Sequence, residues 1–519
     1  MASQFRSMPG AERMILGHPR GLFVLFFVEM LERFSYYGMR ALLVLYLISH
    51  FGFTDAKAYL IYGAYTALAY ITPVIGGKLA DSYLGARKAV LYGAVLLTVG
   101  HFLMGFEGDG GQDGAALSIF YLALGFIVVG VGFLKANIST IVGSLYARDD
   151  RRRDPAFTIF YMGINVGGAI GPIIAGVLGQ RYGWGYGFGA AGVGMFLGLL
   201  VFIWGKPALM GQGEPADPAR LRRRHFGIPA EWIIYLGSIV AVLICWQLVQ
   251  FQEVVGLLLG VSGAILVGYV LFTAVFKLPK VDRDRIFAAL FLILLSILFW
   301  ALFEQAGSSL NVFTDRRVDR SFMGGEVPAS VFQSINSIYI VLLAPSFAWI
   351  WMILGRRGWE PSAPAKFGIG LVLLGIGFLA LVVGVPSNPT ALTPVVFVFL
   401  VYFFHTAGEL CLSPIGLSAM TKMALPQMVG LIMGTWFFAT SMGNFAAGLI
   451  AQATGAEDVG PEGVTSVYTT VGWVAIATGA VVILVSPLFK RLMHLDTLGA
   501  DDAVLAGQAG IAEPASVGT

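Results

Sequence analysis

Residues 21–49 read GLFVLFFVEMLERFSYYGMRALLVLYLIS. This stretch is long enough to cross a bilayer, because a transmembrane helix needs about 20 mostly apolar residues. Four charged side chains nevertheless lie inside it, at Glu29, Glu32, Arg33 and Arg40. Charges at that depth are costly in lipid and usually face the interior of a helix bundle. The stretch therefore predicts a membrane-spanning helix with one polar face.

Apolar runs of this kind recur along the whole chain. Of its 519 residues, 57% are hydrophobic and only 12% are charged, and the mean hydropathy is +0.79. Soluble domains carry about 25% charged residues. We therefore predict an all-α integral membrane protein with fourteen transmembrane helices. The expected spans are residues 21–49, 57–80, 88–107, 115–146, 155–179, 184–204, 229–250, 254–276, 286–313, 329–354, 366–385, 393–422, 427–452 and 465–489.

The placement of basic residues predicts the orientation of these spans. If the N-terminus is cytoplasmic, 24 of the 33 Lys and Arg residues fall in cytoplasmic segments and five fall in loops on the other side. This is the asymmetry that the positive-inside rule describes. We therefore expect a multi-pass protein of the cytoplasmic (inner) membrane with both termini in the cytoplasm. The outer loop at 314–328 is the exception, because it holds three arginines.

An Arg-rich segment after the sixth span predicts the domain organisation. A six-plus-six arrangement around such a joint is typical of secondary transporters. The next two spans contain only Glu231 and Glu253 as charges, both near span ends, so we expect them to form a peripheral hairpin. The expected domains are an N-terminal six-helix bundle at 1–204, a cytoplasmic linker at 205–228, an inserted transmembrane hairpin at 229–276, a C-terminal six-helix bundle at 277–495 and a disordered cytoplasmic tail at 496–519.

The charged residues of the first span share one helical face. Glu29, Glu32, Arg33, Tyr36 and Arg40 follow i, i+3, i+4, i+7, i+11 spacing. Glu29 and Arg33 can form an i, i+4 ion pair, which leaves Glu32 able to bind a proton. A salt bridge that rearranges on protonation can couple a proton to a conformational change. The alternative is a structural salt bridge that fixes helix packing.

Two further polar residues lie in spans of the first half. Lys135 can pair with the acids of the first span or hold a substrate carboxylate, or its side chain can extend to the membrane surface. Asn165 can hydrogen-bond a peptide-like group or a neighbouring helix. Close by, Gly167, Gly168 and Gly171 favour close helix packing.

The second half carries isolated carboxylates. Glu304 and Glu409 each lie in a long apolar span, where each can bind a proton, bind a substrate ammonium or serve structure alone. Trp436 can line a pocket or pack, and His101 and His405 are expected to pack. Because the first half supplies cations and the second supplies anions, a zwitterion such as a peptide or amino acid fits better than a sugar.

Other chemistry finds little support in the sequence. Cys245 and Cys411 lie in apolar runs and are expected to be buried small hydrophobic residues. No Cys/His spacing is typical of a metal site, and no intramembrane nucleophile–base pair indicates an enzyme. We expect no metal, no cofactor other than protons as the coupling ion, and no nucleic-acid partner.

Three motifs resemble a known family. Residues 29–38 (EMLERFSYYG) and 157–167 (FTIFYMGINVG) are similar to the two signatures of the proton-dependent oligopeptide transporter family (POT/PTR). Residues 76–88 (GGKLADSYLGARK) are similar to the motif of the broader major facilitator superfamily. The resemblance spans about residues 20–490, and the inserted hairpin is typical of bacterial members.

The resemblance implies proton-coupled symport of di- and tripeptides into the cell by alternating access, on the major facilitator fold. It implies a proton-coupling set of Glu29, Glu32, Arg33, Lys135 and Glu304. It implies a substrate-binding set of Tyr37, Arg40, Tyr70, Lys135, Asn165, Asn336, Glu409 and Trp436. In that set Arg40 and Lys135 hold the peptide carboxylate, Glu409 holds the ammonium, and the two asparagines bond the peptide backbone. The superfamily motif implies a conformational set of Asp81, Arg87 and Lys88.

Alternatives remain within and outside transport. A proton-coupled nitrate, amino-acid or drug transporter could use the same fold, and a peptide sensor could bind without transport. Animal members of the family that this chain resembles carry a histidine in the second span. The span at 57–80 holds none here, so the resemblance implies that carboxylates carry the protons. The expected partners are peptides, protons and the lipid bilayer, and the chain is expected to function as a monomer.

Overall fold

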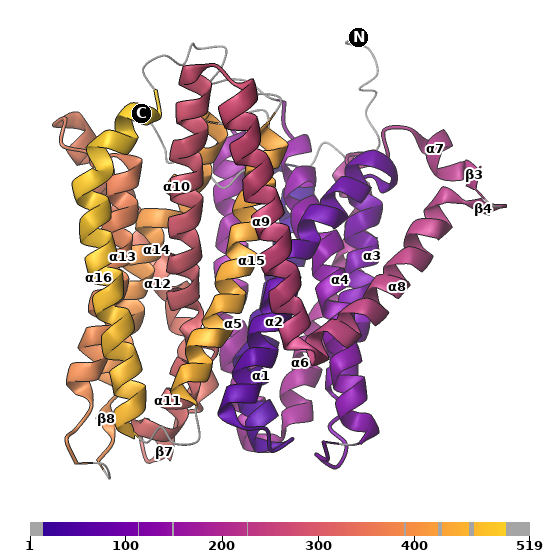
Figure 1. The fold of residues 1–519 in the computed structure, drawn as a ribbon. Coiled ribbons are helices and arrows are strands. Elements are labelled where there is room, and N and C mark those ends of the chain that lie inside the picture. Colours follow the sequence, from indigo (N-terminus) through magenta and orange to yellow (C-terminus); the bar gives the residue numbers. More distant parts are fainter. Residues whose placement is uncertain are drawn as a thin grey trace. The chain divides into compact units, whose positions relative to one another are not determined.

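A computed structural model describes residues 14–112, 114–147, 150–225, 227–388, 391–423, 428–455 and 461–494. Figure 1 shows that nearly all of this chain is helical, and that the helices run as long rods. The tail predicted at 496–519 lies outside the described residues. Within them, twelve helices are long and apolar enough to cross a membrane. Two more, α1 and α15, are 30 and 26 residues long, so the all-α fold with fourteen long helices is confirmed.

The long helices have the following bounds in the described residues: α1 (Arg20–Ser49), α2 (Asp55–Leu79), α3 (Ala86–Met104), α4 (Ala115–Ser144), α5 (Arg153–Tyr182), α6 (Trp184–Gly205), α8 (Ala230–Gln250), α9 (Gln252–Lys277), α10 (Lys280–Phe303), α12 (Ser334–Arg356), α13 (Ala363–Gly384), α14 (Val396–Met423), α15 (Val429–Thr454) and α16 (Pro461–Leu492).

Short elements connect these helices. They are two short α-helices, α7 (Pro218–Arg222) and α11 (Ser309–Arg317), a π-helical turn η1 (Ala80–Leu84), and three 3₁₀ turns, η2 (Lys206–Leu209), η3 (Glu304–Gly307) and η4 (Ala329–Gln333). The strands are β1 (Met14–Ile15), β2 (His18–Pro19), β3 (Arg224–His225), β4 (Ile228–Pro229), β5 (Val318–Asp319), β6 (Ser321–Phe322), β7 (Gly325–Glu326) and β8 (Thr393–Pro394). Strands β1–β2, β3–β4 and β6–β7 pair antiparallel, and β5–β8 pair parallel.

The span expected at 286–313 is confirmed within Lys280–Arg317, but it is not one uninterrupted α-helix. Helix α10 ends at Phe303, η3 follows, and α11 starts only at Ser309. The backbone leaves helical geometry at Ser308, with φ −123° and ψ −104°. A Cβ on Gly307 would overlap the Tyr62 side chain, so the chain approaches that ring closely at the break. Such short 3₁₀ stretches inside long helices often mark functional sites.

The described chain divides into two compact units. Unit 1 comprises residues up to Leu42 and residues 71–250, and unit 2 comprises residues 43–70 and the chain from Phe251 onward. The boundary therefore crosses α1 and α2, so that each of these helices contributes to both units. The domain bounds expected from the sequence divide the chain by counting helices, whereas these units are defined by packing. The expected bounds therefore stay a prediction.

In unit 1, glycines bring α5 against α1. Gly163, Gly167 and Gly171 recur every four residues and so share one face of α5. A Cβ on Gly167 would overlap the carbonyl oxygen of Met30, and one on Gly171 would overlap that of Phe34. These glycines hold the backbone of α5 against the part of α1 that carries the charged residues.

We expect Gly167→Ala to destabilise the protein despite the higher helix propensity of alanine. The added methyl group must displace the α1 backbone, and overpacking of this kind costs roughly 1–3 kcal/mol. Gly237→Ala in α8 is the matched control, because a Cβ there meets no heavy atom within 4 Å. Thermal unfolding in detergent should show a lower midpoint for Gly167→Ala alone. Equal midpoints for both variants would contradict the close-packing account.

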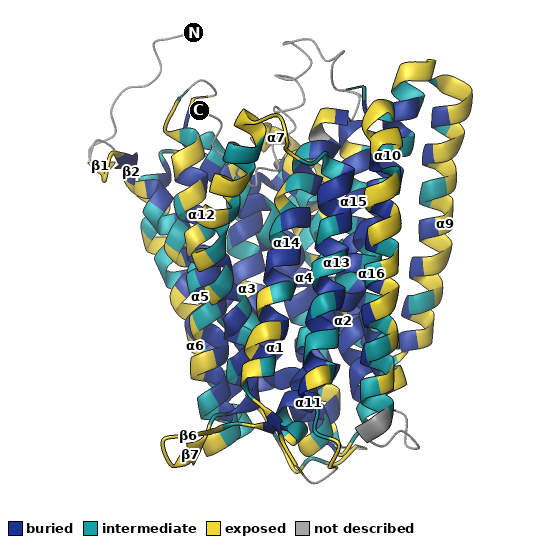
Figure 2. Ribbon diagram, turned by 90° about the vertical axis from the view of Figure 1, so that its left-hand side faces the viewer, coloured by how far each residue is buried: buried dark blue, intermediate teal, exposed yellow. Residues whose placement is uncertain are grey.

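In unit 2, aromatic side chains fill the core between α10, α13, α14 and α16. Phe299, Phe367 and Phe378 are completely buried. Helix α13 packs along both α14 and α16, and glycines allow the close approach. Figure 2 shows the buried residues concentrated inside this group of helices.

Helices α8 and α9 are each buried along one stripe only. On α9 the buried residues include Val255, Leu259, Gly263 and Val270, at helical spacing. They face α15 and α10 of unit 2, whereas α8 packs on α4 of unit 1. Figure 2 shows exposed residues along much of α9. An apolar exposed face on a long helix suits contact with lipid.

Ion pairs account for two of the three arginines expected in the 314–328 loop. Arg316 forms a bidentate ion pair with Asp55 of unit 2, with N–O distances of 2.7 and 2.9 Å. Arg320 pairs with Glu326 at 2.8 Å. Because carboxylates neutralise these bases, the loop contributes less positive charge than the residue count indicates.

Candidate functional site

Three charged residues of α1 form a buried triad in unit 1. The Arg33 Nε donates to Glu29 Oε1 at 2.7 Å and lies 3.1 Å from Glu32 Oε2. The three side chains are only 6%, 2% and 1% exposed. Within the described residues, Glu29 Oε2 and both oxygens of Glu32 lack a hydrogen-bond partner. One guanidinium thus serves two carboxylates, and Glu32 is the more weakly held.

Two more predicted residues lie close to this triad. Lys135 of α4 is half-buried and near enough to act electrostatically on the Glu32 carboxylate. Asn165 of α5 is buried, and its amide donates to the Tyr161 carbonyl at 3.1 Å, one turn earlier in its own helix. The structure thus brings Glu29, Glu32, Arg33 and Lys135 together as one group with two negative and two positive charges. The side-chain amide of Asn165 therefore donates at least one hydrogen bond within its own helix.

Arg40 lies two turns further along α1. Its side chain is buried, and its guanidinium stands 5.7 Å from the centre of the Tyr37 ring. At that distance the ring face attracts the cation. The aromatic ring thus helps to hold the guanidinium in place.

In unit 2, Asn336 and Glu409 form a pair across two helices. The amide nitrogen of Asn336 on α12 donates to Glu409 Oε2 at 3.0 Å and to Thr406 Oγ1 at 3.1 Å, both on α14. Both Asn336 and Glu409 are half-buried. The sequence predicted each of these two residues as a site residue but did not predict their contact, because they are 73 positions apart. The amide fixes the carboxylate of Glu409 while part of it stays accessible.

The other lone carboxylate lies at the helix break of unit 2. Glu304 is buried in η3, next to Gln305. The Gln305 amide donates to the carbonyls of Ala301 and Ala447 at 3.0 Å, and its oxygen accepts from Ser309 at 2.6 Å. Hydrogen bonds thus hold both sides of the break, and they place Glu304 where the helical ladder ends.

The remaining predicted pocket residues differ in exposure. Tyr70 on α2 is half-buried. Trp436 on α15 is only 3% exposed and meets the Phe367 ring edge to face at 6.3 Å. His405 packs on Phe378, with ring centres 4.7 Å apart, as its expected packing role requires. Trp436 therefore packs in the core of its unit.

The conformational set of the superfamily motif is only partly joined. Arg87 pairs with Glu214 of the linker at 2.7 Å, and Lys88 pairs with Glu231 of α8 at 2.5 Å. Asp81 is exposed and forms no ion pair within the described part of the chain. The two bases therefore tie α3 to the linker and to α8, and not to Asp81.

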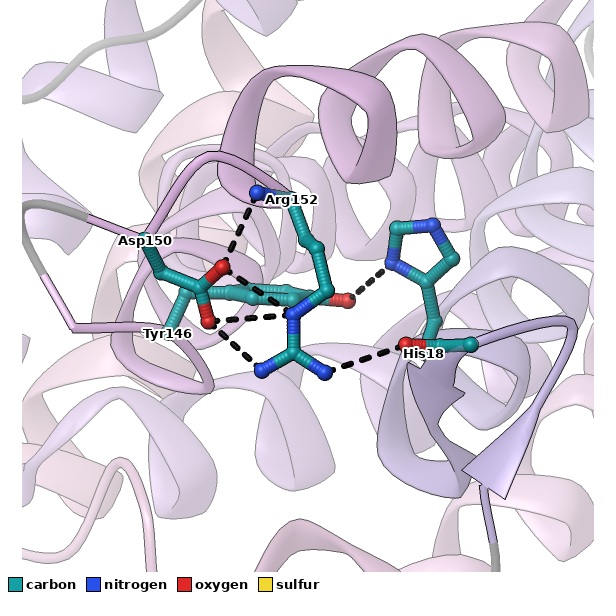
Figure 3. Close-up of polar contacts among 5 residues, drawn as sticks. His18, Tyr146, Asp150 and Arg152 are labelled. Atoms are coloured by element: carbon teal, nitrogen blue, oxygen red, sulfur yellow. Dashed lines mark hydrogen bonds and ion pairs between the residues drawn. The ribbon is translucent and has the colours of Figure 1, made fainter.

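A polar cluster that the sequence did not reveal holds the β1–β2 hairpin to the α4–α5 connection. The Tyr146 hydroxyl lies 2.9 Å from His18 Nδ1 (Figure 3). Arg152 donates to both oxygens of Asp150 and, at 3.1 Å, to the carbonyl of Gly17. No signal links His18 to Tyr146, because the two residues are 128 positions apart.

The ionisation of this cluster predicts a pH-dependent attachment of the hairpin. Burial, helped by the charge of Arg152 and opposed by Asp150, lowers the pKa of His18 below its usual 6.5. Arg152 holds the pKa of Asp150 at about 2, and burial raises that of Tyr146 to about 12. Since Asp150 stays ionised and Tyr146 stays neutral between pH 5 and 8, a pH dependence of the attachment in that range arises from His18. A detached His18 binds a proton more readily, so attachment is complete above pH about 6.5 and weakens as the pH falls below it.

Hydrogen exchange of residues 14–19 measures this effect. After correction for intrinsic exchange rates, protection should be lower at pH 5.5 than at pH 7.5. In His18→Gln the amide can still accept from Tyr146 but does not titrate, so protection should not change with pH. A pH dependence that persists in His18→Gln would assign the effect to another group.

Fourteen long helices in the described residues, with acids and bases buried within each unit, define a polytopic membrane protein, and comparison with known proteins agrees. A family model described as the POT family matches residues 87–470. The peptide transporter YePEPT of Yersinia enterocolitica is 36% identical over 94% of this chain and 97% of its own length. Dipeptide and tripeptide permease B of Photorhabdus luminescens is 31% identical over 92% and 98%.

A solved structure agrees in fold as well. The crystal structure of a peptide transporter POT in complex with sulfate has a TM-score of 0.81 and 36% sequence identity, covering 93% of this chain and 97% of that one. The chain belongs to the POT family. It is therefore a membrane transporter and not an enzyme, and the family expected from residues 29–38 and 157–167 is confirmed.

Proposed function

We propose that this chain carries di- and tripeptides into the cell together with protons, by alternating access. The observation that carries the proposal is the buried triad of Glu29, Arg33 and Glu32, with Lys135 nearby. Relatives that cover almost the whole chain are named for peptide, dipeptide and tripeptide transport. We place the protein in the cytoplasmic membrane with both termini inside, and we expect a monomer to be sufficient.

Charge balance gives a mechanism for coupling within unit 1. The triad and Lys135 are neutral together when both glutamates are ionised. A proton on Glu32 leaves the group with one net positive charge, which is costly in a buried site. A peptide carboxylate restores neutrality, so proton binding and carboxylate binding favour each other. Arg40 adds a second cation for the same carboxylate.

The pair in unit 2 supplies the complementary chemistry. We propose that Glu409, oriented by Asn336, binds the peptide ammonium. A carboxylate fixed by an amide and still half-exposed is suited to a charge-assisted hydrogen bond with a cation. We further propose Glu304, at the helix break, as a second proton site, and Tyr37, Tyr70, Asn165 and Trp436 as pocket residues.

Competition for transport tests the substrate class. Proteoliposomes that contain the protein take up labelled dialanine, and unlabelled compounds compete for that uptake. Dialanine and trialanine should compete, whereas nitrate and N-acetyl-dialanine should be weaker by about tenfold or more, since each lacks the ammonium that Glu409 would bind. Free alanine keeps both charges but has no peptide bond for the asparagines, so it should also compete more weakly. Competition by nitrate or free alanine at the level of dialanine would instead assign the chain to a nitrate or amino-acid transporter of the same fold.

A further inference from the structure

A cavity of about 320 Å³ lies between α3 and α8, apart from the charged residues of α1. Its walls are Arg87, Lys88, Leu91, Tyr92, Val95, Glu231 and Tyr235, all of unit 1. Helix α3 begins at Ala86 and α8 at Ala230, so the cavity lies where two membrane helices start. In Figure 1 this is the end of α8 that follows β3 and β4.

The cavity presents charges of both signs. Lys88 Nζ lies 2.5 Å from Glu231 Oε1, and the Tyr235 hydroxyl donates to the same carboxylate at 3.0 Å. The Lys88 and Glu231 side chains are 30% and 26% exposed, so each can also meet a ligand. Within the described residues, Arg87 Nε is buried without a hydrogen-bond partner. Two cations and two carboxylates thus meet at this site, because Arg87 also pairs with Glu214 of the linker at 2.7 Å.

An apolar path leaves the cavity along α3. Val95, Val99 and Phe102 are 40%, 39% and 45% exposed, and they follow one another at helical spacing. Exposed apolar residues on a membrane helix face hydrocarbon chains. The charged cavity therefore continues into a lipid-facing surface. A site that binds a lipid headgroup needs such a surface for the acyl chain of the lipid.

We propose that this cavity binds the headgroup of an aminophospholipid. The phosphate lies against Lys88 and Arg87, the primary ammonium donates to Glu231, and one acyl chain follows Val95. A purely anionic headgroup would meet the Glu231 carboxylate unfavourably, and a choline headgroup has no N–H to donate. The lipid thereby joins α3 to α8 at the membrane surface.

The test measures lipid binding to the purified full-length protein in detergent. The probes are phosphatidylethanolamine, phosphatidylcholine and phosphatidylglycerol with identical chains, and binding is followed by native mass spectrometry. Phosphatidylethanolamine should bind about tenfold more tightly than the other two, as expected for a charge-assisted hydrogen bond. Glycerophosphoethanolamine and inorganic phosphate, which lack chains, should bind far more weakly. Equal binding of the three lipids, or tight binding of inorganic phosphate, would overturn the proposal.

Two variants divide the headgroup between its charges. Glu231→Gln should remove the preference for phosphatidylethanolamine over phosphatidylglycerol, while Lys88→Gln should weaken both lipids together. Glu253→Gln, an exposed glutamate at the start of α9, is the matched control and should change neither. A lipid preference unchanged in Glu231→Gln, or changed equally in Glu253→Gln, would contradict the proposed site. The two test variants should change lipid binding in different ways: one loses a preference and the other loses affinity for both lipids. A general loss of folding would not produce both results.

Discussion

Glu32→Gln is expected to abolish accumulation of peptide driven by a proton gradient, while exchange of peptide across the membrane continues. Glu32 is 1% exposed, lies 3.1 Å from Arg33, and has no hydrogen bond to either carboxylate oxygen within the described residues. It is therefore the carboxylate of the triad best placed to accept a proton. Glutamine has nearly the same shape as the protonated acid but cannot release a proton.

The readout separates coupling from binding. With an inward proton gradient, Glu32→Gln proteoliposomes should reach only the equilibrium level of labelled dialanine, whereas wild-type proteoliposomes exceed it. Counterflow driven by unlabelled peptide inside should persist in both. Glu253→Gln, outside the triad, serves as the matched control and should behave like the wild type. Gradient-driven accumulation at the wild-type level in Glu32→Gln would exclude Glu32 as the coupling carboxylate.

Of the proposed substitutions, Arg33→Met is expected to lower the free energy of unfolding most. It is also expected to abolish transport. The guanidinium donates a hydrogen bond to Glu29 at 2.7 Å and also lies 3.1 Å from Glu32. Removing one partner of a buried ion pair costs about 3–5 kcal/mol, because an uncompensated charge remains. Methionine fills similar space without charge. Thermal unfolding in detergent and the amount of folded protein recovered from membranes both measure the loss.

A compensating variant distinguishes charge from packing. Arg33→Met combined with Glu29→Gln and Glu32→Gln leaves no buried charge in the triad, so most of the lost stability should return. Gradient-driven accumulation should not return, since no carboxylate is left to titrate there. If Arg33→Met alone is as stable as the wild type, the ion pairs of Arg33 with Glu29 and Glu32 do not contribute to the stability of the protein.

The charged face of α1 could be predicted because its cause is local. Helical spacing alone places Glu29, Glu32 and Arg33 within reach of one another, and the structure finds them in contact. The transmembrane helices could be predicted for a similar reason, since each needs only a long apolar run. Their number and approximate positions agree with the structure.

What could not be predicted depends on contacts between distant segments. The Asn336–Glu409 pair joins α12 to α14, and the His18–Tyr146 contact joins the first strands to the end of α4. The break after Phe303 lies within a run that contains no proline. At the break the chain passes close to Tyr62 of α2, a contact that periodicity along one helix cannot reveal.

The most direct test of the central claim is the uptake of labelled dialanine by wild-type proteoliposomes, with and without an inward proton gradient. We expect accumulation above equilibrium only with the gradient, and acidification of the lumen that depends on added peptide. Equal uptake in both conditions, without peptide-dependent proton movement, would show that transport is not coupled to protons and would contradict the account.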